Sequence, residues 1–441
     1  MSGYFLPEMD YQDVEVKTGL DEKTSRELEI ISAVATIRGT KTNVLWGVGV
    51  GGSVDSNPLF HEGKVIFGSC DKNLYAVYME NGKLAWKFGT GAPVFYLGCI
   101  HKGRVYFGSF DGNLYCVDAD TGKRVWKLGI GSPIGVGPAI HEETLYLGAR
   151  DGNLYAVSTN GRLIWRFSTN GPVVCHPVIY KKRVYFGSWD YNLYCLDTKT
   201  GKLLWKFPTG EKVNCSPTVH DEMIIFGSYD HRIYALSAES GNLIWSRKFE
   251  VPESTQFNPV SKGTIFFGLR NMNFVALDAK TGNLRWRFSG NDMMSGSAVV
   301  HNSAVYFGSC DNNVYAVSEK TGKLLWKFST NGILDCALRM NNDIIYAGSW
   351  DCNLYAINTN GELVWKFPTS LGYPSVVEDM EEMQSTPSFE VIINQESSRE
   401  EKYRETKPLG DYGAISDQYM NMSHYTSGMN NYVKKDKRRY M

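Results

Sequence analysis

Histidine, cysteine and acidic side chains build most metal and catalytic sites, so their spacing is considered first. Five of the eight histidines occupy one position of a repeating unit: His61, His101, His141, His220 and His301. A four-ligand metal site needs all its donors within about 2.0 to 2.3 Å of one ion, whereas successive repeats place equivalent residues on separate units. We therefore interpret these histidines as turn residues, and we predict no metal site.

The nine cysteines form no adjacent pair and no C-x-x-C motif, which favours reduced thiols over a disulfide framework or a structural zinc site. Cys116 and Cys195 lie in apolar segments, where a thiol packs as a small hydrophobe. Cys70, Cys310 and Cys352 lie in turns, and a positive neighbour would have to lower the pKa of such a thiol to make it reactive. Gly-x-Ser-x-Gly, Walker and Rossmann fingerprints are also absent from the sequence, so we predict no catalytic residue.

The near-zero net charge argues against binding to nucleic acid or to a membrane surface by overall electrostatic attraction. The 441 residues contain 46 basic and 47 acidic side chains and carry a formal charge of -1, so we predict no DNA binding. Although 43% of the residues are hydrophobic, no stretch approaches the roughly 20 apolar residues of a membrane span. The N-terminus lacks the basic region of a secretory signal, and we expect a soluble, cytoplasmic protein.

Tryptophan reveals an internal repeat, because nine of these residues are spaced by 39 to 41 positions. They are Trp46, Trp86, Trp126, Trp165, Trp205, Trp245, Trp286, Trp326 and Trp365. Each interval contains a Gly-x-x-Asp or Gly-x-x-Asn turn, the first at Gly68 to Asp71. A glycine also precedes each of the last eight tryptophans by four residues, beginning with Gly82, and predicts hairpin turns with a positive φ.

Each repeat is predicted to form four short strands. In the first unit these are 54–60, 64–68, 74–78 and 83–88, separated by turn residues. Apolar residues follow one another without alternation, as in Val65-Ile66-Phe67, which is typical of sheets covered on both faces. Eight such units predict an all-β fold, an eight-bladed β-propeller of four-stranded antiparallel blades. We place the propeller at 41–369, a short N-terminal extension at 1–40 and a largely disordered, flexible C-terminal tail at 370–441.

The segment from Cys116 to Trp126 makes the repeat more specific. Its pattern, Ala/Cys-x-Asp-x-x-Thr-Gly-Lys-x-x-Trp, resembles the tryptophan-docking motif of the pyrroloquinoline-quinone (PQQ) type propeller repeats. That family includes quinoprotein dehydrogenases and many non-enzymatic members, and the resemblance covers about residues 41 to 369. It implies that the nine repeat tryptophans are structural, each indole docking between neighbouring blades.

The sequence offers nine tryptophan-bearing strands, whereas a ring of eight blades has only eight outermost strands. The segment around Trp365 has its own hairpin, whereas the segment around Trp46 runs directly into the first blade. One of the two must complete the last blade, and Trp46 either closes the ring or forms an added edge strand.

The variable residue of each Gly-x-x-Asp turn is expected to lie on one face of the ring. These residues are Cys70, Phe110, Arg150, Trp189, Tyr229, Arg270, Cys310 and Trp350. Aromatic residues and arginine are enriched in binding hot spots. We therefore predict partner binding by Phe110, Arg150, Trp189, Tyr229, Arg270 and Trp350; in the alternative interpretation, each packs over the turn of a neighbouring blade.

Polar residues at the start of the innermost strands are expected at the mouth of the central channel. The candidates for binding a small polar ligand are Asp55, Asn57, His176, Asn214, Asn258 and Asp335. Such side chains at a channel mouth also commonly hold only water.

The C-terminal tail is rich in tyrosine and methionine and ends in a basic tip, Lys434 to Arg439. This composition predicts a segment that docks on an acidic protein surface or on RNA, the alternative being a solubilising tail.

Function follows less directly than fold. We predict a non-catalytic protein-interaction scaffold without a cofactor, which binds a protein partner through its turn-rich face and through the tail. The alternative is a PQQ-dependent oxidoreductase or a small-ligand-binding propeller; the resemblance would then imply PQQ and calcium at the channel mouth. The chain lacks the vicinal cysteine pair and the large inter-blade insertions of the dehydrogenases, and it lacks the lipoprotein cysteine of the related bacterial outer-membrane assembly factor.

Overall fold

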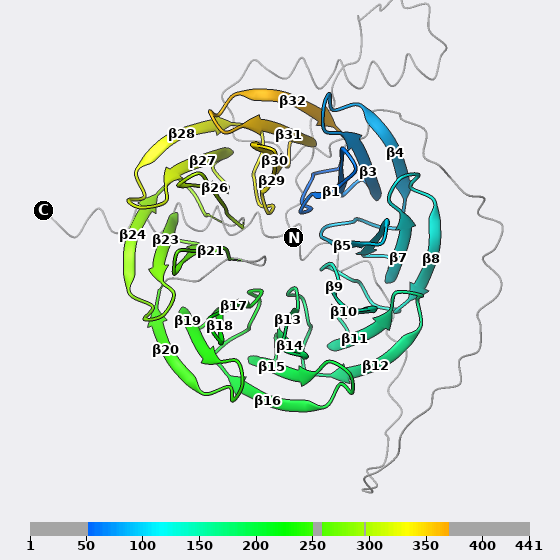
Figure 1. The fold of residues 1–441 in the computed structure, drawn as a ribbon, viewed down its shortest axis with the longest axis vertical. Helices are drawn as coiled ribbons and strands as arrows, with labels where there is room; N and C mark the ends of the chain where they lie inside the picture. The colour runs from blue at the N-terminus through cyan, green and yellow to red at the C-terminus, as the bar shows by residue number, and fades with distance from the viewer. Residues whose placement is uncertain (1–51, 250–257, 295–296, 370–441) are drawn as a thin grey trace, which may run out of the picture. The chain divides into compact units, whose positions relative to one another are not determined.

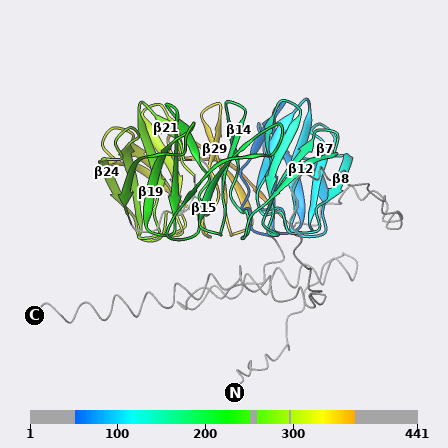
Figure 2. The ribbon, with the colours of Figure 1, turned by 90° about the horizontal axis from the view of Figure 1, so that it is seen from below.

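Eight four-stranded antiparallel sheets surround a central axis in the computed structural model, which describes residues 52–249, 258–294 and 297–369 (Figure 1). The strands of each blade follow one another in the chain. Seen at right angles, they cross the ring from one face to the other (Figure 2). The predicted all-β, eight-bladed architecture is confirmed, while the predicted extension at 1–40 and the tail at 370–441 lie outside the described residues.

Blades 1 to 4 occupy the first half of the ring. Blade 1 consists of β1 (Leu59–His61), β2 (Lys64–Gly68), β3 (Asn73–Tyr78) and β4 (Leu84–Gly89). Blade 2 consists of β5 (Leu97–His101), β6 (Arg104–Gly108), β7 (Asn113–Asp118) and β8 (Arg124–Gly129). Blade 3 consists of β9 (Ala139–His141), β10 (Thr144–Gly148), β11 (Asn153–Ser158) and β12 (Leu163–Ser168). Blade 4 consists of β13 (Val178–Tyr180), β14 (Arg183–Gly187), β15 (Asn192–Asp197) and β16 (Leu203–Pro208).

Blades 5 to 8 form the second half of the ring. Blade 5 consists of β17 (Thr218–His220), β18 (Met223–Ser228), β19 (Arg232–Ser237) and β20 (Leu243–Lys248). Blade 6 consists of β21 (Val260–Ser261), β22 (Thr264–Gly268), β23 (Asn273–Asp278) and β24 (Leu284–Ser289). Blade 7 consists of β25 (Val299–His301), β26 (Ala304–Gly308), β27 (Asn313–Ser318) and β28 (Leu324–Ser329). Blade 8 consists of β29 (Arg339–Asn341), β30 (Ile344–Gly348), β31 (Asn353–Asn358) and β32 (Leu363–Pro368).

The hydrophobic core lies between the blades. Val65, Ile66 and Phe67 of β2 are all fully buried, because successive side chains of a strand face the two neighbouring blades. The innermost strand of blade 1 starts at Leu59, later than the predicted 54–60, and residues 54–58 form part of the linker from the preceding blade. Asn57-Pro58 is a pair typical of turns and precedes the observed start of the strand, a signal that the predicted bounds overlooked.

Each docked indole joins one blade to the next. The Trp86 Nε1 donates a hydrogen bond to the Ala119 carbonyl of blade 2 at 3.1 Å, and Trp126 donates likewise to Thr159 of blade 3 at 3.0 Å. The other donors are Trp165, Trp205, Trp245, Trp286, Trp326 and Trp365. The eight repeat tryptophans that lie within the described residues thus all bond to the next blade.

The hairpin glycines complete the same contact. All eight have a positive φ, for example +68° at Gly82 and +71° at Gly122. A Cβ at Gly122 would lie 2.6 Å from the Trp86 ring, so this position requires glycine both for its backbone conformation and for space.

The last blade meets the first in the same way as every other pair. β32, which carries Trp365, is the outermost strand of blade 8, and the Trp365 Nε1 donates to the Met79 carbonyl of blade 1 at 2.8 Å. Near the axis, the Val54 N–H donates to the Ser349 carbonyl at 3.1 Å. The Trp365 strand therefore completes the last blade, whereas Trp46 lies outside the described residues. Across those described ranges, no helix is long and apolar enough to cross a membrane.

Candidate functional site

The turn between the second and third strands of each blade lies beside a linker that runs toward the channel. The Phe110 N–H donates to the Pro93 carbonyl of such a linker at 3.0 Å, and Trp189 donates likewise to Pro172 at 3.0 Å. Corresponding bonds hold Cys70, Arg150, Tyr229, Cys310 and Trp350. These turns and linkers lie on one face of the ring, which we call the turn face.

On blades 4 to 6 the predicted ring residues contact one another through a channel candidate. The Trp189 Nε1 donates to the Asn214 Oδ1 at 2.9 Å, and the Asn214 Nδ2 lies 3.4 Å from the Tyr229 hydroxyl. The Lys212 Nζ lies 4.3 Å from the centre of the Trp189 ring, and the Arg270 guanidinium lies 5.0 Å from that of Tyr229. A cation over an aromatic face is attracted by the ring quadrupole, which holds both rings in place.

Blades 2 and 3 repeat this combination. Phe95 and Phe110 meet edge to face with their ring centres 4.5 Å apart. The Arg150 guanidinium lies 5.1 Å above the Phe110 ring. Both Phe110 and Arg150 remain half-buried, so part of each side chain still faces solvent.

Between blades 8 and 1 the corresponding group is acidic. Asp55 is buried, and its Oδ2 accepts a hydrogen bond from the Ser53 hydroxyl at 3.0 Å and from the Cys70 thiol at 3.4 Å. Burial raises the pKa of Asp55, although Ser53, Cys70 and Trp350 partly offset this by stabilising the charged carboxylate.

The two predicted sites therefore form one surface. Trp189 meets Asn214 and Trp350 meets Asp55, each pair joining a turn to the following linker. Asp335 occupies the equivalent place before blade 8, because Leu334 makes the same backbone bond to Ser309 as Val54 makes to Ser349. The ring residues do pack over neighbouring turns, as the alternative interpretation expects, yet they remain half-exposed. Their role in binding stays a prediction.

Deeper in the channel, the predicted polar residues hold the inner ends of the blades together. The Asn57 Oδ1 accepts a hydrogen bond from the Leu97 N–H at 2.9 Å, and the Asn258 N–H donates to the Thr218 hydroxyl at 3.2 Å. The His176 N–H donates to the Ser216 hydroxyl at 2.9 Å. Asn57, His176 and Asn258 are each at most 3% exposed, so their first task is structural.

Sequence reasoning missed three residues of these surfaces. Lys212 lies on the turn face, while Tyr96 and Arg339 belong to the channel. The Lys212 Nζ meets the Trp189 ring of the preceding blade, a contact that no spacing within one repeat reveals.

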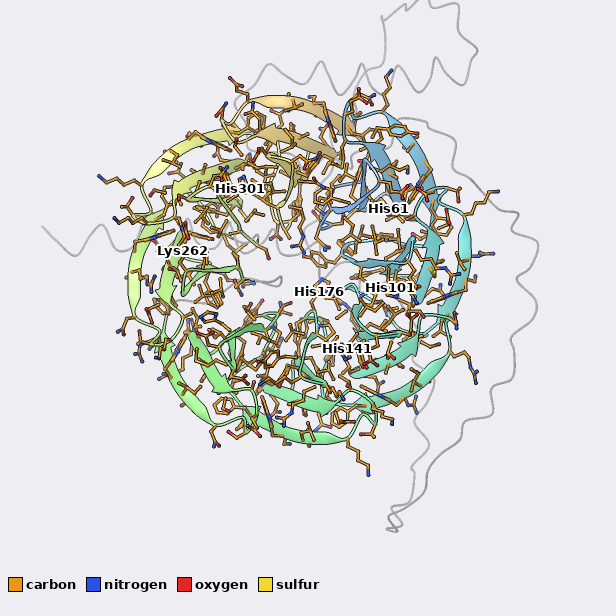
Figure 3. All side chains as sticks on the ribbon, viewed as in Figure 1. His61, His101, His141, His176, Lys262 and His301 are labelled. Carbon is orange, nitrogen blue, oxygen red and sulfur yellow. The ribbon has the colours of Figure 1, made fainter. Side chains whose placement is uncertain are left out.

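The five histidines end the innermost strands, and their predicted placement in turns is wrong. A two-residue turn, Glu62-Gly63 in blade 1, follows His61 directly, so the strand extends to the histidine. Figure 3 places His61, His101, His141 and His301 at the inner part of the ring. The His101 Nε2 lies 3.1 Å from the Glu143 Oε1 of the next blade, which shows a role in joining blades.

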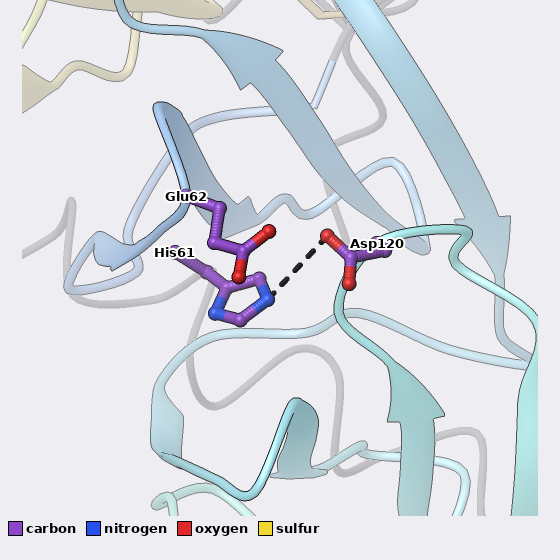
Figure 4. Close-up of side chains that lie close together, drawn as sticks. All are labelled: His61, Glu62 and Asp120. Carbon is purple, nitrogen blue, oxygen red and sulfur yellow. Dashed lines mark ion pairs between the residues drawn. The ribbon is translucent and has the colours of Figure 1, made fainter.

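One group of three potential metal ligands forms within the described ranges: His61, Glu62 and Asp120 (Figure 4). The His61 Nε2 lies 3.4 Å from the Asp120 Oδ1, but the Lys64 ammonium lies closer to the same oxygen, at 2.9 Å. A divalent cation would have to compete with that ammonium, so we propose no metal site here.

Burial suppresses the reactivity of the turn cysteines for which a pKa shift is resolved. It raises the pKa of Cys70 well above its usual range, and the Asp55 carboxylate raises it further. Burial likewise raises the pKa of Cys352 to about 11. These thiols are therefore protonated at neutral pH and are poor nucleophiles.

Eight four-stranded blades, joined by docked tryptophans that close the ring, define a PQQ-type β-propeller. A family model described as outer membrane protein assembly factor BamB matches residues 110–193, 150–289 and 270–396, which together span more than half of the chain. The chain belongs to this family. No curated protein sequence matches it.

Three solved structures share the fold. BamB from Moraxella catarrhalis has a TM-score of 0.60 at 20% identity, covering 67% of this chain and 94% of that chain. The computationally designed Ika8 protein has a TM-score of 0.61 at 16% identity, covering 72% and 96%. A europium-containing methanol dehydrogenase has a TM-score of 0.59 at 14% identity, covering 73% and 86%. Identities this low show the fold alone.

The channel residues do not fit the calcium ion that accompanies PQQ in the dehydrogenases. Calcium takes six to eight oxygen ligands, usually including several carboxylates. Of the channel candidates only Asp55 and Asp335 are carboxylates, and within the described part of the chain no third carboxylate or histidine gathers with them. One Asp55 oxygen is already held by Ser53 and Cys70.

Proposed function

We propose that this chain is a non-catalytic scaffold that binds a protein partner through the turn face, using Phe110, Arg150, Trp189, Tyr229, Arg270 and Trp350. The observation that carries the proposal is the set of three cation–aromatic pairs on one face, in which half-exposed aromatic rings are held by Arg150, Lys212 and Arg270.

Restraint of these side chains favours binding. Ordering a long side chain at an interface costs roughly 0.5 to 1.5 kcal/mol, and a side chain already held by its neighbours avoids much of that cost. Trp189 is held both by Asn214 and by Lys212. Trp, Tyr and Arg are also the residue types that dominate measured hot spots.

The family supports a protein as the partner. Its model is described as an outer membrane protein assembly factor, and Moraxella catarrhalis BamB shares the fold. The same fold also serves a methanol dehydrogenase, so fold alone does not decide between the two functions.

Replacement of Trp189 and Trp350 by alanine tests the proposal. The matched control is Tyr78→Ala, which removes an exposed aromatic side chain, 46% exposed, from the opposite end of β3. We expect affinity purification of the tagged full chain to lose its specific co-purifying protein in the double variant and to retain it in the control. A second arm that ends the chain at residue 369 measures what the tail adds.

Equal recovery with the double variant and with the wild type would contradict the proposal. Saturable PQQ binding with dye-linked dehydrogenase activity would favour the oxidoreductase alternative.

A further inference from the structure

Arg339 is the one charged residue at its position among the eight innermost strands. In β29 it pairs with Tyr346 of the adjacent strand. The equivalent residues, taken from the same register in the other blades, are Leu59, Cys99, Ala139, Val178, Thr218, Pro259 and Val299. Because no other blade carries a charge at this position, the repeat pattern does not explain the arginine.

Arg339 is half-buried beside the channel. The structure gives its side chain neither a hydrogen bond nor an ion pair with any residue of the described ranges. Burial lowers the pKa of the guanidinium below its usual range, although arginine stays charged at any physiological pH. The half-buried guanidinium therefore presents a positive charge to the channel that no carboxylate of the described ranges neutralises.

The charge of Arg339 reaches across the channel. His176 lies before β13 in blade 4, which is diametrically opposite blade 8 in a ring of eight, and Figure 3 places it near the centre. Burial, followed by the charge of Arg339, lowers the pKa of His176 to about 4. The Tyr96 ring of blade 2 lies 6.2 Å from the His176 ring. Residues of three blades thus influence one another near the axis, through the contact between the Tyr96 and His176 rings and through the charge of Arg339, and the histidine is neutral at pH 7.

A second polar group lies next to Arg339. The Ser297 carbonyl of blade 7 accepts a hydrogen bond from the Leu338 N–H, one residue before Arg339, at 3.3 Å. Ser297 is 4% exposed, and its hydroxyl has no hydrogen-bond partner. Buried hydroxyl groups nearly always have a partner, so this hydroxyl is available to donate to a ligand or a water molecule.

We propose that the central channel binds a small monovalent anion, of the size of a halide or a formate, on the guanidinium of Arg339 with the Ser297 hydroxyl as a second donor. One uncompensated positive charge calls for one negative charge. The fork of guanidinium N–H groups suits a carboxylate or a single ion equally well. None of the predicted turn-face ring residues takes part, so the anion site is independent of partner binding.

Thermal unfolding of the full chain with bromide as the probe tests this site. Bromide replaces a large sulfonate buffer anion at constant ionic strength, and formate replaces it in a parallel series. A ligand that binds only the folded state raises the Tm with its concentration. We expect the Tm of the wild type to rise with each tenfold increase in bromide, and the Tm of Arg339→Met not to change.

Arg166→Met is the matched control, because it makes the same chemical change at an exposed position of β12. It should keep the full bromide response. Arg339→Lys keeps the charge without the fork and should retain part of it. Without bromide, Arg339→Met should be at least as stable as the wild type, because it removes an uncompensated charge, so misfolding is not the expected cause of a lost response.

Anomalous scattering from bromide-soaked crystals locates the ion directly. The expected result is a peak beside the Arg339 guanidinium that is missing in Arg339→Met. A Tm response shared by wild type and Arg339→Met, or bromide peaks at surface positions only, would overturn the proposal.

Discussion

At the scale of single residues, most of the polar side chains near the axis serve the fold before they serve a ligand. Asn57 and Asn258 bond the linkers of neighbouring blades, and Asp55 is held by Ser53 and Cys70. His176 differs, because burial and a cation across the channel keep it neutral. Its protonation is therefore coupled to the stability of the whole ring.

The stability of the ring should fall as the pH drops from about 6.5 to 4. The pKa of His176 is about 4 in the folded state, against about 6.5 in an unfolded chain, so the unfolded state takes up the proton first. The stability that neutral His176 contributes is fully present above pH 6.5 and is lost as the pH approaches 4. The loss amounts to at most about 3 kcal/mol. Urea unfolding at pH 7, 5.5 and 4.5 measures it.

His176→Gln removes this titration, so its free energy of unfolding should change less than that of the wild type over the window. Replacement of the exposed His231 by glutamine is the control and should follow the wild type. The pKa values of Glu143 and Asp278 are lowered to about 2 by their hydrogen-bonding partners, so their stabilising contributions also start to fall at the acidic end of this window, but they do so equally in all three proteins. Identical pH slopes for wild type and His176→Gln would refute this account of His176.

At the scale of elements, neighbouring blades are held together by an indole that packs against the hairpin of the next blade. Two junctions lack the pair of aromatic rings that lies beside the indole elsewhere. Six pairs of blades join a phenylalanine to a tyrosine, as Phe167 joins Tyr194 with ring centres 5.6 Å apart. Blades 2 and 3 join Leu128 to Tyr155 instead, and blades 5 and 6 carry Arg247 and Val275. The Arg247 Nη2 instead donates to the Thr281 carbonyl at 2.6 Å, and a cavity of about 310 Å³ lies nearby, lined in part by Phe249 and Leu269.

Gly122→Ala should weaken the contact between blades 1 and 2. The matched control is Gly103→Ala, because Gly103 has nearly the same φ, +69° against +71°, but no atom near its missing Cβ. Both changes carry backbone strain, and only Gly122→Ala also meets the Trp86 ring. We expect it to lower the free energy of unfolding by a further 1 to 3 kcal/mol or so, as overpacking does. If both variants lost the same free energy of unfolding in chemical denaturation, the Trp86 ring would be shown to move aside without cost.

The sequence was most informative where the physics is local and repeated. A glycine four residues before each of the last eight repeat tryptophans predicted the positive φ, and the resemblance to the PQQ-type repeats implied the docking contact. Each glycine meets the indole of the preceding repeat. The start of the first strand was misplaced, because the mostly polar linker at 54–58 was included in the strand despite its Asn57-Pro58 turn signal. Interactions across the ring, such as the effect of the Arg339 charge on the pKa of His176, join positions far apart in the chain and follow from closure alone.

At the scale of the whole molecule, ring closure converts eight similar units into two different faces. One face carries the ring of half-exposed aromatic and cationic side chains, and both ends of the described ring lie on it, since the Thr369 hydroxyl donates to the Gly52 carbonyl at 2.7 Å. Blades joined by a docked indole at every junction make a rigid platform, which suits recognition of a partner by a fixed surface. The central claim is that partner binding belongs to this face.

Site-specific photocrosslinking tests that claim most directly. A benzoylphenylalanine replaces Phe110 or Tyr229 on the turn face and, as the control, Tyr78 at the other end of the blades. The account predicts a crosslink to the same partner protein from both turn-face positions and none from position 78. A crosslink from position 78 alone would contradict it.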